Sequence, residues 1–548
     1  MIDSLLSREQ SFVKAIEQEW DIIIIGGGAT GCGAALDAVS RGLKTLVVEK
    51  ADFASGTSGR STKLIHGGLR YLKNMEFALV REVGQERAIL QRNARHLVHR
   101  DPMFLPVYKG GELGWTTTAI ALWVYEWLAG VESSERRVML SVEDTLLQLP
   151  LLQTKGLKGS AKYFEYRTDD ARLTLSLALT ARQKGATLLN YATVEAFTYS
   201  NDGKQIKGVV VKDEVTAQSY SLKARCVVNA AGPWVDRIST LDKTIAHQPK
   251  LAGSRGIHIV LSSFDFPLKQ AVYFDAPDGR MVFAIPREEM VYVGTTDVFY
   301  KGSLEDPEIP VKEMEYLLSC VREKFQVNNI SLAQIHSAWS GVRPLVMEQG
   351  KAEGKISRKD ELYTSKSGLI TITGGKLTGY RKMAQRAVDE VCKQLQHTVR
   401  SNTRNLSLWG GGFPSDEAFA YFVSTKTLEV MSALNILRYE AELLVRRYGD
   451  HADAFLAYIP KANYYVQKYQ APLSFTLQIV YAVAVEQALK PDDVYIRRTT
   501  DFYFRLVELK PNYKKLIAIM ADCLSQDENW IKQEEAVFLA HVQNLRLE

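Results

Sequence analysis

The stretch that decides the fold is Asp21-Ile-Ile-Ile-Ile-Gly26-Gly-Gly-Ala-Thr-Gly31-Cys-Gly-Ala-Ala-Leu-Asp-Ala-Val-Ser40. Its four consecutive isoleucines predict a strand that is covered on both faces, as in a parallel sheet. Glycines then predict a turn over 26–33, a helix follows over 34–40, and 45–49 is a second apolar strand. The chain therefore opens with one strand–helix–strand unit.

The turn in this unit fits the pattern GxGxxG, with its key glycines at Gly26, Gly28 and Gly31. Gly26 suits a tight turn, Gly28 lets a pyrophosphate approach the backbone, and Gly31 lets the helix pack close to the sheet. The helix N-terminus then offers N–H groups to the phosphates, and Glu49, at the end of the second strand, can bind ribose hydroxyls. This context predicts a dinucleotide site, but the motif alone does not separate FAD from NAD.

Three regions follow from the patterns along the chain. Residues 1–19 predict a short amphipathic docking helix that carries Leu5, Phe12, Val13 and Ile16. Residues 20–395 predict a Rossmann-like α/β domain interleaved with a substrate-binding domain, mainly 80–165 and 240–355, whose short strands at 270–296 suggest an antiparallel meander. The pattern over residues 396–548 predicts an all-α C-terminal domain. Long helices are expected at 76–98 and 170–184, and a strand at 369–373 precedes a helix that ends near residue 395.

Bulk composition narrows the class of protein. The apolar fraction of 46% and the charged fraction of 24% are those of a globular protein, and a net charge of +5 over 548 residues argues against nucleic-acid binding. The five cysteines show no CxxC spacing, and no histidine has metal-ligand spacing with a second class of ligand; His96 and His99, at i and i+3, are interpreted as lying on a solvated helix. We therefore expect neither a disulfide framework nor a metal. No signal peptide or membrane span is apparent, so a cytoplasmic protein is expected.

Further motifs carry a resemblance to a known family. In their order along the chain they resemble, over about residues 20–395, the bacterial FAD-dependent glycerol-3-phosphate dehydrogenases. The resemblance implies FAD as cofactor and the fold of D-amino-acid oxidase and glutathione reductase, with an inserted antiparallel substrate domain. The matching segments are Ala54-Ser-Gly-Thr-Ser-Gly-Arg-Ser-Thr-Lys-Leu-Ile-His-Gly-Gly-Leu-Arg-Tyr71, Tyr166-Arg-Thr-Asp-Asp-Ala-Arg172, Val228-Asn-Ala-Ala-Gly-Pro-Trp234, Gly294-Thr-Thr-Asp297, Ser340-Gly-Val-Arg-Pro-Leu345, Ile356-Ser-Arg358 and Gly374-Gly-Lys-Leu-Thr-Gly-Tyr-Arg381.

Cofactor contacts are expected from three of these segments. A run of hydroxyls beside glycines suits hydrogen bonding to a flavin or its pyrophosphate. The small residues after the strand at 226–230 suit a close backbone approach, and by resemblance form a second FAD contact. The Gly374-Gly-Lys376 segment, interpreted as the start of a helix, can direct N–H groups at the flavin, and this second glycine-rich junction favours FAD over NAD. The expected residues are Thr57, Ser58, Ser61, Thr62, Ala231, Gly232, Gly375, Lys376, Leu377 and Thr378.

Oxidation of a secondary alcohol beside a phosphate needs cations for the dianion and a base for the hydroxyl proton. The cations lie inside the matching motifs, and arginine suits phosphate because its planar fork binds two oxygens. Histidine is the natural base, with His66 the first candidate and His258 the second. Thr296 and Asp297 are interpreted as shaping the pocket. The expected substrate residues are Arg70, Tyr71, His258, Arg343, Arg358 and Lys376, with His66, Lys376 and Arg343 as the catalytic set.

The resemblance implies oxidation of sn-glycerol 3-phosphate to dihydroxyacetone phosphate by hydride transfer from C2 to flavin N5. Electrons then pass to a membrane quinone or, in the oxidase branch, to O2 with release of H2O2. Some oxidases carry a long insertion that this chain lacks, which favours the quinone. Quinone use implies peripheral contact with the inner face of the cell membrane, for which the stretch 113–128 with Trp115, Trp123 and Trp127 is a candidate. The sequence leaves the oligomeric state open, a homodimer included.

Two other functions compete with this one. A flavin amine or amino-acid oxidase shares the GxGxxG fold, but it needs a carboxylate clamp and has no need of converging cations. A non-enzymatic flavin protein would be marked by a broken substrate pocket, whereas Arg343, Arg358 and Lys376 are all present.

Overall fold

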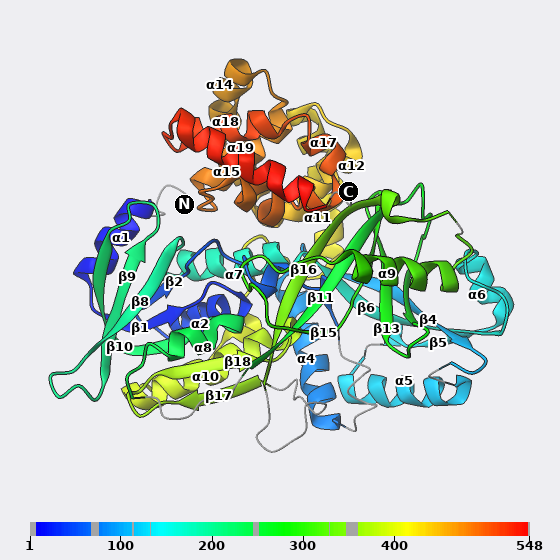
Figure 1. The fold of residues 1–548 in the computed structure, drawn as a ribbon, viewed down its shortest axis with the longest axis horizontal. Coiled ribbons are helices and arrows are strands. Elements are labelled where there is room, and N and C mark those ends of the chain that lie inside the picture. The colour runs from blue at the N-terminus through cyan, green and yellow to red at the C-terminus, as the bar shows by residue number, and fades with distance from the viewer. Residues whose placement is uncertain are drawn as a thin grey trace.

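The computed structural model describes residues 7–66, 76–111, 114–131, 133–244, 251–327, 329–346 and 360–545. Two sheets lie side by side, and a layer of helices, orange to red in Figure 1, covers one side of both. No helix among these residues combines the length and apolar character that a bilayer span requires.

The first sheet has a parallel centre in the order β18-β10-β1-β2-β7. Ile22, Ile23 and Ile24 of β1 are fully buried, which confirms the strand covered on both faces. The antiparallel strand β17 pairs with β18, and β9 joins β8 to β10. The bounds are β1 Trp20–Ile25, β2 Thr45–Val48, β7 Thr187–Leu189, β8 Ala192–Tyr199, β9 Ile206–Asp213, β10 Ser219–Asn229, β17 Asp360–Thr364 and β18 Ile370–Gly374.

Helix α2 (Ala29–Ser40) follows β1 and packs against α7 (Asp170–Gln183) and α10 (Tyr380–Leu395). The prediction that this helix begins at residue 34 was wrong. It begins at Ala29 after the extended N-cap Gly28, so two helical glycines, Gly31 and Gly33, lie inside it. The predicted helix over 170–184 is confirmed by α7, and the pattern over 76–98 contains α4 (Phe77–Asn93) and then a turn.

The second sheet is mostly antiparallel and contains the predicted meander as β12, β13 and β14. A parallel pairing of β12 with β4 connects the meander to the strands from earlier in the chain. The limits of the substrate domain remain a prediction. The strands are β3 Leu64–Ile65, β4 Val98–Tyr108, β5 Val138–Leu140, β6 Leu157–Thr168, β11 Leu251–Ser262, β12 Ala271–Asp275, β13 Met281–Arg287, β14 Met290–Gly294, β15 Val298–Tyr300 and β16 Ile335–Val346, and the helices around them are α4, α5 Trp115–Ala129, α6 Val142–Gln148 and α9 Val311–Lys324.

The N-terminal helix α1 (Arg8–Glu17) is capped by Ser7, whose side chain and that of Gln10 form a capping box. Phe12 packs into the core beside the first sheet. The predicted apolar face of this helix is only partly correct, because Val13 and Ile16 are exposed while Ala15 is buried. Leu5 lies outside the described residues.

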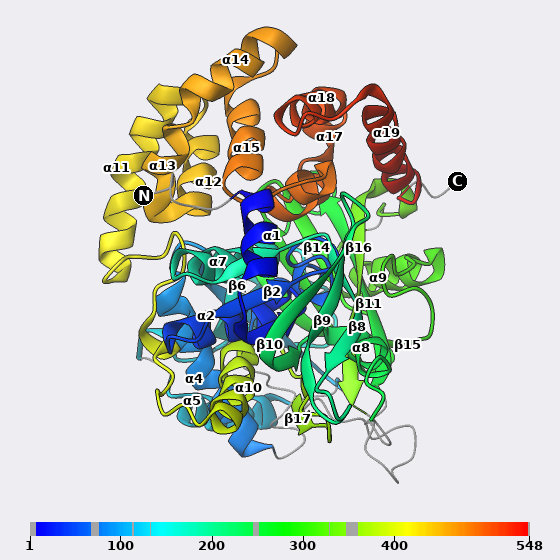
Figure 2. The same cartoon turned by 90° about the vertical axis from the view of Figure 1, so that its left-hand side faces the viewer.

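The C-terminal region is helical from α11 onward, as predicted (Figure 2). A π-helical turn, Asp493–Arg498, interrupts the series. The helices are α11 Asp416–Leu434, α12 Arg438–Tyr448, α13 Ala452–Leu456, α14 Ile459–Tyr469, α15 Leu473–Ala484, α16 Asp501–Phe504, α17 Leu506–Leu509, α18 Tyr513–Cys523 and α19 Glu528–Gln543.

The ion pair between Asp492 and His541 predicts a pH dependence for the docking of α19. The two side chains meet at 3.0 Å (Oδ2 to Nε2). Burial lowers the His541 pKa, but the hydrogen bond and charge of Asp492 outweigh burial and raise it, while His541 helps to hold the Asp492 pKa at about 2. The stabilisation is therefore full below the ordinary histidine pKa of ~6.5 and is lost as pH rises through the raised value. On the acid side it is lost as pH falls from ~3.9 toward the lowered Asp492 value.

We expect His541→Gln to lower the urea midpoint more at about pH 5.5 than at about pH 8.5, because only the protonated imidazole pairs with the carboxylate. Equal losses at both pH values would show that the pair does not couple protonation to stability.

Candidate functional site

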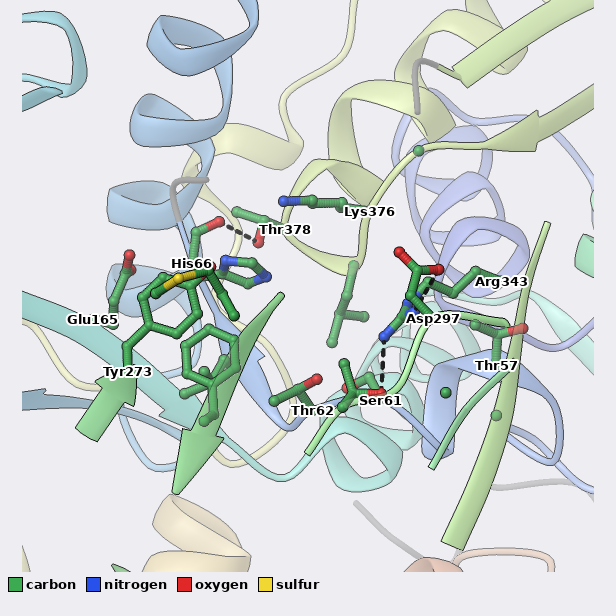
Figure 3. A pocket seen from close by; sticks show the side chains of 18 of the residues that line it. Thr57, Ser61, Thr62, His66, Glu165, Tyr273, Asp297, Arg343, Lys376 and Thr378 are labelled. Atoms are coloured by element: carbon green, nitrogen blue, oxygen red, sulfur yellow. Dashed lines mark hydrogen bonds and ion pairs between the residues drawn. The ribbon is translucent and has the colours of Figure 1, made fainter. Parts of the chain in front are cut away.

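A cavity of about 1020 Å³ lies between the two sheets and the helices α4 and α5. Its wall combines the segment after β2, the junction between β18 and α10, the ends of β14 and β16, and the inner face of α5. Figure 3 shows His66, Lys376, Arg343 and Asp297 around one space. Within the described ranges, no three His, Cys, Asp or Glu side chains gather so that they could hold a metal ion.

The glycine turn has the close contacts that the motif predicts. A Cβ on Gly31 would lie 1.9 Å from the Gly26 carbonyl oxygen, and Gly26 itself has φ +115. Glu49 accepts hydrogen bonds from the N–H groups of Gly27 (2.6 Å) and Ala51 (2.9 Å), and its burial raises its pKa. Gly26, Gly28, Gly31 and Glu49 shape the turn, while Ala29 and Thr30 at the start of α2 line the cavity. A helix N-terminus at the cavity wall fits a pyrophosphate.

Gly31→Ala is expected to give a protein that retains little FAD. The new methyl would clash with the Gly26 carbonyl, and overpacking of this kind costs ~1–3 kcal/mol or more. The ratio of flavin to protein absorbance after gel filtration measures the loss. Gly114→Ala is the control, because an added Cβ on Gly114 would meet Thr117 Oγ1 at an ordinary distance of 3.8 Å, and its φ of −73 suits alanine. Equal flavin content in both variants would contradict the role given to Gly31.

The four hydroxyl residues expected at the cofactor, Thr57, Ser58, Ser61 and Thr62, line the cavity, but their hydroxyls already have protein partners. Thr57 donates to the Val342 carbonyl (2.6 Å), and Ser61 donates to Asp170 (2.7 Å). The Ser58 hydroxyl accepts from the Ala29 N–H (2.9 Å). Thr57 and Ser61 therefore shape the wall first, and their oxygens keep acceptor capacity for a cofactor.

The second glycine junction lies on the same cavity. Gly375, Lys376, Leu377 and Thr378 line it, as does Gly232 after β10, whereas Ala231 does not appear in the described wall. The prediction that a helix starts at 374–376 was wrong. A short 3₁₀ turn, Leu377–Gly379, comes first, and α10 begins at Tyr380.

The three predicted catalytic residues share the cavity. Arg343 Nη1 lies 3.7 Å from Asp297 Oδ1, and its Nη2 donates to Thr295 Oγ1 at 3.4 Å. The Thr378 hydroxyl donates to the His66 carbonyl oxygen at 3.3 Å, which ties His66 to the junction that carries Lys376. The predicted substrate residues Arg70, Tyr71 and Arg358 lie outside the described residues.

His258 lies behind this wall and is not among its described lining residues. It is buried, stacks on Trp339 with ring centroids 4.7 Å apart, and its Nε2 is 3.0 Å from Thr62 Oγ1. Burial, then Arg343 and Lys63, lower its pKa well below the ordinary value. A neutral His258 therefore contacts the cavity wall through the Thr62 hydroxyl. Asp297 lines the cavity as predicted, while Thr296 is buried against Glu313.

Several lining residues were missed at the sequence level, among them Arg60, Glu165 and Tyr273. Glu165 precedes a matching motif on β6, and Arg87 Nη1 lies 3.4 Å from its Oε2. No local pattern distinguishes Glu165 or Tyr273 from other strand residues. They line the cavity because of the places of β6 and β12 in the sheet, on either side of β4.

Comparison with known proteins agrees with this geometry. Residues 21–381 match the family described as FAD dependent oxidoreductase, and residues 401–531 match the family described as the C-terminal domain of alpha-glycerophosphate oxidase. The chain is 44% identical over 527 residues to aerobic glycerol-3-phosphate dehydrogenase of Staphylococcus aureus, covering 95% of this chain and 94% of that protein.

Comparison with solved structures points to the same family. Glycerol-3-phosphate dehydrogenase from Bacillus halodurans, complexed with FAD, is 36% identical, covers 98% of this chain and 97% of that one, and has a TM-score of 0.85. L-alpha-glycerophosphate oxidase from Mycoplasma pneumoniae, at 18% identity, with 70% of this chain and 97% of that one covered and a TM-score of 0.55, shares the fold. Extensive identity over nearly the whole length, together with the cavity and its glycine junctions, shows that this chain belongs to the aerobic glycerol-3-phosphate dehydrogenases, a family of FAD-dependent oxidoreductases.

Proposed function

We propose that this chain oxidises sn-glycerol 3-phosphate to dihydroxyacetone phosphate and passes the electrons to a membrane quinone. The observation that carries the proposal is the meeting of Arg343, Lys376 and His66 in one cavity that also holds both glycine junctions. FAD, when bound there, supplies the acceptor for the hydride that leaves C2.

Arg343 and Lys376 bind the phosphate dianion in this proposal. Arg343 lines the cavity beside Asp297, with Nη1 3.7 Å from Oδ1, and its guanidinium suits the dianion because it can bind two phosphate oxygens. Arg70 and Arg358 complete the proposed cation set. Opposite charges attract more strongly in apolar surroundings, and Leu105, Leu122 and Phe283 make part of the cavity wall apolar.

His66 takes the proton from the C2 hydroxyl in this proposal. Its imidazole lines the cavity, with its ring 6.1 Å from the Phe283 ring in an edge-on arrangement, and its carbonyl is held by Thr378. Thr62 precedes β3 in the same segment as His66 and is hydrogen-bonded to His258, and in this proposal its hydroxyl orients the substrate.

Helix α5 is the proposed membrane contact. Its inner face, including Thr118 and Leu122, lines the cavity, while Trp123 and Trp127, which are not among the described lining residues, are 58% and 76% exposed. Tryptophans at a surface suit the interface of a bilayer. A quinone dissolved in the bilayer would then meet the helix that forms the cavity wall.

We expect replacement of both Trp123 and Trp127 by serine to weaken binding to phosphatidylglycerol-containing vesicles about tenfold or more, because burying a large apolar side chain contributes ~1.5–3 kcal/mol. Vesicle flotation measures the binding. Tyr421→Ser on α11 is the control, since Tyr421 is 72% exposed but lies in the C-terminal region. Equal binding by both variants would remove α5 from the contact.

Steady-state turnover tests the reaction and the acceptor together. The purified holoenzyme is given sn-glycerol 3-phosphate, its enantiomer, glycerol or an amino acid, with a soluble quinone under nitrogen or with O2 alone. The proposal expects turnover with sn-glycerol 3-phosphate and quinone, and little H2O2 with O2. Fast H2O2 production would make the chain an oxidase, and turnover of the amino acid alone would overturn the substrate.

A further inference from the structure

A buried cluster of ion pairs joins the C-terminal helices to the first sheet, outside the cavity. Asp52, in the segment that follows β2, accepts from Arg497 Nε at 2.7 Å and from Arg498 Nη2 at 2.9 Å. Arg498 Nη1 donates to the same carboxylate. Asp52 is fully buried and Arg498 is 1% exposed, so water does not substitute for these contacts.

The two arginines are themselves held within the C-terminal region. Arg497 also donates to Asp493, and Asp493 accepts from the backbone N–H groups of Leu489 (2.8 Å) and Lys490 (3.0 Å). Arg498 donates to the Glu486 carbonyl oxygen at 2.8 Å. Both arginines lie on the π-helical turn, a rare conformation that is frequent at functional sites. These contacts within the C-terminal region hold both guanidinium groups in the positions from which they bind Asp52.

Asp52 lies in the middle of a segment that surrounds the glycine turn, and we define this segment, residues 49–59, as the collar. At one end of the collar Glu49 accepts from the Gly27 N–H (2.6 Å), and near the other Ser58 accepts from the Ala29 N–H (2.9 Å). Between them the Ala54 N–H donates to the Gly27 carbonyl oxygen at 3.1 Å. The collar therefore sets the position of the backbone N–H groups at the start of α2.

The collar is not stable by local preference alone. Ala54 has φ +63, a left-handed conformation that a residue with a side chain rarely adopts unless its surroundings impose it. Burial pushes the Asp52 pKa up, but Arg498 and Arg497 outweigh burial and hold that pKa below its usual range. Without the arginines the buried carboxylate would take up a proton or move toward water, and the collar would move with it.

We propose that Arg497 and Arg498 are positioning residues for the cofactor, which hold Asp52, and through it the collar, in the shape that binds the pyrophosphate of FAD. The C-terminal region thereby acts on the cofactor without touching the cavity at this point. We call the contacts of Arg497 and Arg498 with Asp52 the clamp. Binding to a site that is already ordered avoids the cost of ordering it, so the clamp raises FAD affinity.

Release of FAD from the holoenzyme tests the clamp. Arg498→Met keeps the length and apolar stem of the side chain but removes its charge, and we expect FAD to be released about tenfold faster or more on dilution, as followed by flavin fluorescence. Arg182→Met is the matched control, because Arg182 crosses the same junction to the Val485 carbonyl but does not reach the collar. Hydrogen exchange in the holoenzyme adds a second readout, with faster exchange expected at collar amides in Arg498→Met alone.

A double-substitution cycle separates a clamp from general destabilisation. If Arg498 acts through Asp52, FAD release from the double variant Asp52→Asn with Arg498→Met equals that of Asp52→Asn alone. Should Arg498→Met fail to fold, Arg498→Lys takes its place, because it keeps the charge and loses the second hydrogen bond. Release no faster than in the Arg182→Met control, or effects of the two substitutions that add, overturns the proposal.

Discussion

Replacing His66 with alanine is expected to slow reduction of the bound flavin by sn-glycerol 3-phosphate by about 10²–10⁴-fold, while FAD stays bound. A positioned base contributes that much when it removes the proton that the alcohol must lose as the hydride departs. His66 lines the cavity, whereas the glycine turn proposed to hold the pyrophosphate of FAD lies in a different segment, so FAD retention is not expected to change. Single-turnover absorbance measures the rate, and the flavin-to-protein ratio measures retention.

His258→Phe is the control for this prediction, since phenylalanine preserves the stack on Trp339 but cannot bond to Thr62. We expect it to slow reduction far less than His66→Ala. Wild-type rates in His66→Ala would eliminate His66 as the base, and a large loss in His258→Phe alone would move the role to the Thr62–His258 pair.

Arg343→Ala is expected to lower kcat/KM for sn-glycerol 3-phosphate by about one to two orders of magnitude, the effect of losing a charge-assisted bond of ~1.5–3 kcal/mol. The guanidinium, 32% exposed in its side chain, faces the cavity beside Asp297. Its removal also leaves that carboxylate to repel the incoming phosphate, which adds to the loss.

A control variant makes the Arg343 result specific. Arg280→Ala should leave kcat/KM for the phosphorylated substrate nearly unchanged, because Arg280 also lines the cavity but pairs with Asp278 at 2.6 Å. An unchanged kcat/KM in Arg343→Ala would remove this arginine from phosphate recognition.

Local patterns predicted the parts of the fold that local forces decide. The predictions of β1 and of the meander β12–β14 were correct. A strand buried on both faces has a continuous apolar run, and turn residues separate the strands of a meander. The start of α2 was predicted too late, because Gly31 and Gly33 are poor helix formers. Tertiary packing overrides that preference: a Cβ on Gly33 would lie 2.8 Å from the Tyr380 ring.

The site was predictable only as a set of motifs. His66, Arg343 and Lys376 could be named because each lies in a distinctive motif, and the structure brings them to one cavity. The position of His258 behind Thr62 depends on a contact between residues 196 positions apart, which no spacing rule reveals. The Asp52–Arg498 pair spans 446 positions and is likewise a product of the tertiary fold.

The measurement that tests the central claim most directly is anaerobic mixing of the purified holoenzyme with sn-glycerol 3-phosphate, followed by the visible absorbance of the bound flavin. The claim predicts rapid bleaching by this substrate, and none by glycerol or by the opposite enantiomer. An oxidised spectrum that persists with sn-glycerol 3-phosphate would contradict it, and bleaching by an amino acid in the same experiment would assign the cavity to a different oxidation.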